Sequence, residues 1–117
     1  MNYLFLQCRV TFSDTIIQMG LLPADSLVLN PFLVVPTAFN AGGNDLIRIG
    51  TALDDDAFGT DHNVASQIIN PTNFAAGAAL GYYAAGTKII ATYGPTGGAP
   101  TTGSAIIILP FLRIKPS

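Results

Sequence analysis

The stretch YLFLQCRVTF, residues 3–12, decides the fold class. Its residues alternate between a mixed set and an apolar set, and successive side chains of a β-strand point to opposite faces of the sheet. The apolar set consists of Leu4, Leu6, Cys8, Val10 and Phe12. This alternation predicts a strand whose apolar face packs on a core, and we expect Cys8 to be a small buried residue of that strand.

Short β-rich runs recur along the rest of the chain, separated by Gly, Pro, Asn and Asp. Because Pro31 and Pro36 each remove a ladder donor, residues 26–39 are predicted as two short strands. Residues 70–83 are rich in alanine and favour a short helical turn, and residues 94–104 predict an extended hairpin loop whose tip is mobile or held by a neighbour. Further strands are predicted at 14–21, 45–51, 63–69, 87–93 and 104–117.

This strand count predicts an all-β fold, an antiparallel β-sandwich that is jelly-roll-like and forms a single domain over residues 1–117. Half of the residues are hydrophobic and only 10% are charged, a low charged share that predicts burial against other chains. No apolar run approaches the roughly 20 residues of a membrane-spanning helix, so no membrane contact is expected. The net charge is −2 and the five basic residues are scattered, so we expect no nucleic-acid binding.

The last predicted strand is apolar on both faces. One face carries Ile106, Ile108, Pro110, Leu112 and Ile114, and the other carries Ala105, Ile107, Leu109 and Phe111. One face of a strand in an antiparallel sandwich commonly meets solvent, so this strand is either covered by a loop or lies in a subunit interface. We favour the interface. The candidate interface residues of this strand are Ile106, Ile107, Ile108, Leu109, Phe111 and Leu112.

The window GTALDDDAFGTDHN, residues 50–63, holds four of the seven acidic residues and the single histidine. Asp54, Asp56 and Gly59 fit the spacing of a helix–loop–helix calcium site, but the later ligand positions are occupied by Phe58 and Ala65. We therefore expect no metal site of that kind. The remaining candidates for a calcium site of another geometry are Asp54, Asp56 and Asp61.

Catalytic chemistry is not predicted. His62 is the only imidazole and Cys8 the only thiol, no nucleophile elbow is present, and residues 94–104 lack the lysine of a phosphate-binding loop. Three consecutive aspartates in water give no paired acid and base. The sequence predicts neither an enzyme nor a cofactor, and the acidic window is expected to be a solvated loop held to the sandwich by Leu53 and Phe58.

Four segments, taken in order, resemble a family of small structural proteins of tailed bacteriophages. They are LLPADSLVL (21–29), PTAFNAGGNDLIRIGTALDDDAF (36–58), GTKIIATYGPTGG (86–98) and TTGSAIIILPFLRI (101–114). The resemblance covers about residues 20–114 and departs at Pro110, Arg113 and Lys115, where an acidic or aromatic ending is expected. It implies a virion component, a capsid cement or decoration protein of jelly-roll-like fold. Such a protein binds the major capsid protein on the outer surface of the capsid, as a homotrimer. The resemblance also implies contacts by the first strand, with Tyr3 and Phe5 as further candidate interface residues.

Three alternatives remain open at this point. A head-to-tail or tail-associated virion protein would differ in its copy number per particle. A carbohydrate- or host-binding module would use Tyr82, Tyr83 and Tyr93 as stacking faces. A calcium-dependent enzyme or binder would be centred on the acidic window. For the cement protein, removal of residues 2–8 is expected to abolish capsid binding while leaving a folded domain.

Overall fold

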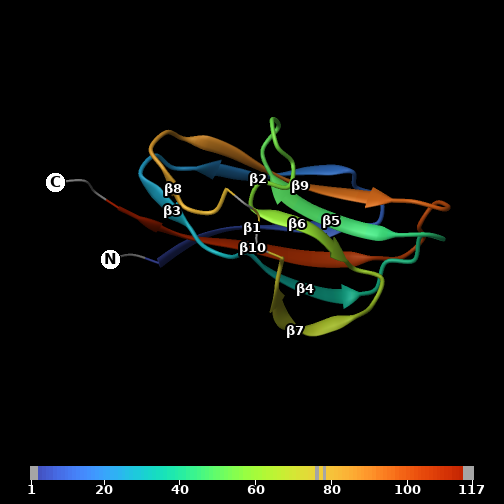
Figure 1. The fold of residues 1–117 in the computed structure, drawn as a ribbon. Coiled ribbons are helices and arrows are strands. Elements are labelled where there is room, and N and C mark those ends of the chain that lie inside the picture. The colour runs from blue at the N-terminus through green and yellow to red at the C-terminus, as the bar shows by residue number, and fades with distance from the viewer. Residues whose placement is uncertain (1–2, 76, 78, 115–117) are drawn as a thin grey trace.

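The computed structural model describes residues 3–75, 77 and 79–114, with only the backbone of Tyr3 (Figure 1). Within these ranges the chain forms ten β-strands and no helix, hence no helix that could cross a membrane. The strands are β1 (Tyr3–Thr11), β2 (Ile16–Leu22), β3 (Ser26–Val28), β4 (Phe32–Thr37), β5 (Asp45–Gly50), β6 (Gly59–Asn63), β7 (Ile68–Asn73), β8 (Tyr82–Tyr83), β9 (Thr87–Pro95) and β10 (Ser104–Arg113).

The strands form two antiparallel sheets, one of six strands and one of four. In the six-stranded sheet β10 is central: β1 pairs along one edge, while β4 and β3 share the other and lead to β7 and β8. The four-stranded sheet has the order β2-β9-β5-β6. The first strand thus pairs with the last, β2 with β9, β4 with β7 and β5 with β6. This nested pairing is that of a jelly roll, and the predicted all-β sandwich is confirmed.

The core lies between the two sheets. From β1, Val10 is fully buried and Leu6 and Cys8 are partly buried against the core, whereas Leu4 and Phe12 at the ends of the alternating run are exposed. The alternation of residues 3–12 therefore predicted the correct inward face over its middle part. Pro31 acted as predicted, because it lies between β3 and β4 and divides residues 26–39 into two strands. Pro36 lies within β4, at the point where the register with β10 shifts.

The reactivity of the Cys8 thiol provides a test of how β1 packs on the core. Burial, followed by the nearby charge of Asp14, raises the pKa of the Cys8 thiol from 9.0 to about 11. Since the thiolate is the reactive form, a rise of this size lowers reactivity about a hundredfold near neutral pH. We expect a disulfide reagent to label native protein at least that much more slowly than urea-unfolded protein. Similar rates in the two states would show that β1 does not pack as described.

Two sequence-based predictions are wrong around the acidic window. Residues 63–69 are not one strand, because Asn63 ends β6 and Ile68 begins β7. Residues 64–67 connect the two, and the Ala65 N–H donates to Asn63 Oδ1 at 2.9 Å. This bond satisfies the backbone locally and favours a turn. The window itself is not one loop, because Gly59–Asn63 forms β6 and pairs with β5.

The helical turn expected within residues 70–83 is absent from the described part of that segment. There the chain forms β7 and β8 and an irregular connection between them. The N–H groups of Gly77 and Ala79 donate to the carbonyls of Phe58 and Ala57, at 3.3 and 3.0 Å. Phe74, the first residue of this connection, is buried. The backbone hydrogen bonds that a helix would use internally are thus made to the neighbouring loop.

The loop predicted as a hairpin is a crossover between the sheets, since β9 and β10 belong to different sheets. It is held by the connection between β4 and β5. Asn40 Oδ1 accepts the N–H groups of Thr101 and Thr102 at 2.7 and 2.9 Å, and the Gly43 N–H donates to the Thr96 carbonyl at 2.6 Å. Of the two outcomes foreseen for this loop, contact with a neighbouring segment is the one observed.

Candidate interaction surface

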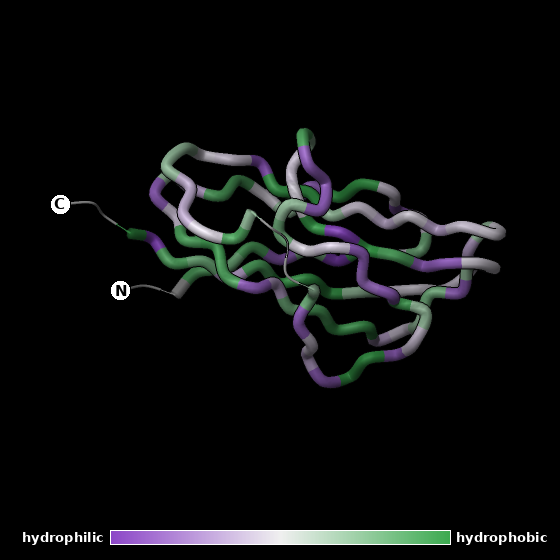
Figure 2. Tube along the Cα trace, in the orientation of Figure 1, coloured by the Kyte–Doolittle hydropathy of each residue, from purple (hydrophilic) through white to green (hydrophobic). Residues whose placement is uncertain are grey.

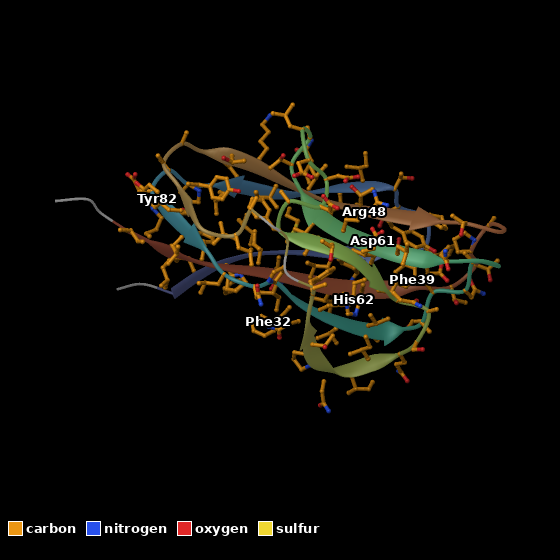
Figure 3. The ribbon with its side chains drawn as sticks, in the orientation of Figure 1. Phe32, Phe39, Arg48, Asp61, His62 and Tyr82 are labelled. Carbon is orange, nitrogen blue, oxygen red and sulfur yellow. The ribbon has the colours of Figure 1, made fainter. Side chains whose placement is uncertain are left out.

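An apolar surface covers the outside of the six-stranded sheet. In β10 the side chains that alternate with the core set are Ile106 and Ile108, which lie opposite Val34 and Phe32 of β4. All four are half-buried without a second sheet over them. Figure 3 shows Phe32 pointing away from the four-stranded sheet. We call this surface the outer sheet face and define it by Phe5, Phe32, Val34, Ile106, Ile108 and Leu112.

The two exposed sheet surfaces differ in charge. Arg9 lies on the same side of the six-stranded sheet as the outer sheet face, opposite Ile106, and donates to Ser104 Oγ at 3.2 Å. The four-stranded sheet carries Arg48 and Asp61, which form an ion pair on its exposed side (Figure 3). Figure 2 shows the hydropathy of whole strands along the trace, with β4 and β10 mostly hydrophobic and much of β6 hydrophilic. Depletion of charge is a mark of the central part of protein interfaces.

The predicted interface residues divide between this surface and the core. Phe5, Ile106, Ile108 and Leu112 belong to the outer sheet face, whereas the side chain of Tyr3 lies outside the described residues. Three candidates are corrected, because they point between the sheets and are at most 4% exposed. They are Ile107, Leu109 and Phe111. One apolar side of β10 therefore builds the core, and the other belongs to the outer sheet face.

Phe32 and Val34 were missed by the sequence reasoning. Their signal is the alternation with Leu33 and Val35, which are fully buried. Residues 26–39 were interpreted through their prolines, and a strand of six residues with apolar side chains on both faces does not reveal which face is inward. The register with β10 settles the question, since it places Phe32 and Val34 beside Ile108 and Ile106.

The acidic candidates are only partly brought together. Carboxylate oxygens of Asp54, Asp55 and Asp56 lie within 4.8 Å of one another. The hydrogen bond that Asp56 shares with Asp54 raises the pKa of Asp56. Asp61 lies apart on β6 and pairs with Arg48, which also contacts Asp55 at 3.2 Å. Asp54 and Asp56 could thus act together on a cation, whereas Asp61 is held by the guanidinium.

The loop of residues 51–58 stands off the sandwich between β5 and β6 (Figure 1). The Thr51 N–H donates to the Asp54 carbonyl at 2.8 Å, and a Cβ added to Gly50 would lie 2.2 Å from that carbonyl oxygen. Phe58 is fully buried and anchors the loop as predicted. The second predicted anchor is wrong, because Leu53 is 101% exposed. The tight turn directs Leu53 into solvent.

Residues 51–57 also border a hollow of about 520 Å³. Its other walls come from the connection before β8, from β8 and from the start of β9. The lining residues are Thr51, Ala52, Leu53, Asp54, Ala57, Ala79, Tyr83, Gly86, Thr87 and Lys88. The hollow combines small apolar side chains with one acidic and one basic side chain.

The three tyrosines do not form a shared stacking surface. Tyr93 is buried in the core, Tyr83 packs edge-on against Phe58 with ring centroids 5.3 Å apart, and Tyr82 is 48% exposed with its hydroxyl donating to Asp25. The geometry proposed for sugar stacking is therefore not present. His62 packs on the ring of Phe74 at 5.2 Å, and burial lowers the pKa of His62.

No family model matches the sequence, and no curated protein matches it either. Solved structures, in contrast, contain chains of the same fold. A chain of the cyanophage Pam1 capsid asymmetric unit superposes with a TM-score of 0.73 at 16% identity, covering 97% of this chain and 86% of that one. This protein shares its fold with a phage capsid component.

Two further phage capsids contain similar chains. One is the acidic stable capsid of the Helicobacter pylori bacteriophage KHP30, with a TM-score of 0.69, 12% identity and coverage of 93% of this chain and 86% of that chain. The other is the capsid of Ralstonia phage GP4, with a TM-score of 0.62, 14% identity and coverage of 97% and 84%. Because both members of each pair are covered almost completely, the matched chains are only slightly longer than this one.

Proposed function

We propose that this protein is a structural virion component of a tailed bacteriophage, a cement or decoration protein that binds the major capsid protein on the outer surface of the capsid as a homotrimer. The observation that carries the proposal is the outer sheet face, an apolar surface on a jelly roll whose fold recurs in three phage capsids. The low charge content of the chain supports the same assignment, since only 10% of its residues are charged and a surface with few charges favours burial against other chains.

A protein of this kind acts by adding buried area across the boundaries of shell subunits. Phe5, Phe32 and Ile108 present apolar area that loses contact with water on binding, which is the main favourable term in protein association. The contact of one copy need not be strong. A trimer that engages three equivalent positions gains avidity from each further contact, so a weak interface can hold many copies on a shell.

The proposal predicts that a charge placed on the outer sheet face prevents capsid binding. Phe5→Asp introduces a carboxylate where the fold exposes 59% of an aromatic side chain, and burying that charge unpaired is costly. We expect its affinity for capsids that lack the protein to fall about tenfold or more. Binding is measured by quantifying the protein on particles recovered from a density gradient.

The matched control is Ile16→Asp, which alters an equally exposed apolar side chain, 58%, on an edge strand of the other sheet. This variant should bind capsids like the unaltered protein. If both variants lose capsid binding equally, or if neither loses it, the outer sheet face does not make the contact. Counting copies in whole particles separates a cement protein, spread over the shell, from a tail-associated protein confined to a single ring.

Truncation is a poor test of this surface. The expectation that residues 2–8 can be removed from a stable domain conflicts with the pairing of β1, which runs along β10 from Tyr3 to Thr11. Leu6 and Cys8 also pack against the core. Their removal would uncover core side chains and the edge of β10, so a loss of binding would follow from unfolding and not from loss of a contact.

A further inference from the structure

The tip of the 51–58 loop places one apolar side chain entirely in solvent. An exposed leucine is not unusual by itself. Here, however, Leu53 lies on a turn closed by two hydrogen bonds between Thr51 and Asp54. The backbone of this turn packs closely against Gly50. Arg48 also contacts Asp55 of the same loop at 3.2 Å. The backbone at Leu53 is thus held in place before any partner arrives, which reduces the conformational entropy lost on binding.

A receptor for such a side chain lies beside it on the same surface. The hollow of about 520 Å³ has a lining that includes Ala57, Ala79 and Tyr83. Leu53 stands at its border and does not fill it, as the complete exposure of that side chain shows. A protruding leucine and a recess that accepts an aliphatic side chain therefore occur together on one patch.

Charge gives the patch a second kind of complementarity. Asp54 and Lys88 both border the hollow. Among the described residues the ion pairs of this region are those of Arg48 with Asp55 and Asp61, so neither Asp54 nor Lys88 belongs to one. A contact related by a two-fold axis places the same patch on both sides and requires that it contain both halves of each interaction. This patch contains both.

We propose that two copies of this chain associate through the patch about a two-fold axis. Leu53 of each copy enters the hollow of the other, and Asp54 of each copy pairs with Lys88 of the other. A basic peptide from another protein would satisfy Asp54 but leave Lys88 facing a like charge. A metal ion would satisfy the carboxylates and leave Leu53 in water. The second copy is the occupant that uses all three features.

The pairing is independent of the proposed virion role and is tested without capsids. Asp54→Lys gives a patch with two positive charges, and Lys88→Asp gives a patch with two negative charges. Each variant should fail to pair with itself, because both cross-axis contacts become repulsive. A mixture of the two variants should pair, because each contact again joins opposite charges. Capture of an untagged variant by a tagged one, followed by mass measurement, reads out the pairing.

The essential control mixes tagged and untagged copies of the same variant. If capture arises from exchange of subunits within a trimer, tagged Asp54→Lys will retain untagged Asp54→Lys as well as it retains Lys88→Asp, and the proposal is overturned. Leu53→Ala should weaken pairing of the otherwise unaltered chain about tenfold or more. Ile69→Ala, which trims an exposed aliphatic side chain on the six-stranded sheet, should leave the pairing unchanged. The proposal would also be overturned if Leu53→Ala pairs as strongly as the unaltered chain.

Discussion

Replacement of Ile107 by alanine is expected to lower the free energy of unfolding by about 2–5 kcal/mol. Ile107 is fully buried at the centre of β10, opposite Cys8 of β1 and Leu33 of β4. Trimming its side chain removes apolar contacts and leaves a cavity that the two sheets cannot close without moving the central strand. Urea-induced unfolding measures the difference, provided that the urea dependence of the transition stays the same.

The neighbouring residue supplies the control for this prediction. Ile108 has the same side chain on the same strand but belongs to the outer sheet face, where it is only half-buried. Ile108→Ala should therefore cost clearly less than Ile107→Ala. The order of the two values is the decisive result. Were Ile108→Ala the more damaging of the two, β10 would face the other way and the outer sheet face would be the core.

Tyr93→Phe is expected to destabilise the protein by about 1.5–3 kcal/mol, the range for a buried hydrogen bond to a charged group. Asp45 is 1% exposed, and its Oδ1 accepts the Tyr93 hydroxyl at 2.5 Å and the Ala41 N–H at 3.1 Å. Within the part of the chain that the structure describes, Oδ2 has no hydrogen-bond partner. Removing the hydroxyl leaves a buried carboxylate with one remaining donor. Burial and the bond to Asp45 both raise the pKa of Tyr93, so the hydroxyl stays protonated.

Tyr82→Phe is the matched control, because the Tyr82 hydroxyl also donates to a carboxylate, Asp25, at 2.5 Å, but at an exposed site. It should change stability very little, since water replaces the lost partner. A cycle with Asp45→Asn isolates the coupling between Asp45 and Tyr93. Equal effects of Tyr93→Phe and Tyr82→Phe would mean that the Asp45 pair is hydrated and not part of the core.

Alternation and turn chemistry carried the prediction of the fold. The strands β1, β2, β5, β9 and β10 follow apolar periodicity, and the break between β3 and β4 follows from Pro31. β6 was missed because it is short and polar, with Asp61 and His62 among its five residues. Its place in the sheet comes from pairing with β5, which no local pattern reveals.

The candidate surface was predicted only in part, for a related reason. Both faces of β10 are apolar, and its central position between β1 and β4 is set by contacts between residues far apart in the sequence. These contacts decide that Ile107 is core and Ile108 is surface. Leu53 was misplaced because a leucine near a buried phenylalanine suggests a common anchor. The turn at Thr51–Asp54, and not hydrophobicity, determines where Leu53 points.

The pairing of β1 with β10 also determines when the six-stranded sheet can form during synthesis. Tyr3 lies opposite Leu112, so the six-stranded sheet joins the beginning of the described chain to its end. During synthesis the ribosome must release β10 before this sheet can form, and a fold dominated by such distant contacts forms slowly. The outer sheet face is built on β10 itself. A nascent chain therefore cannot form the outer sheet face until β10 has left the ribosome.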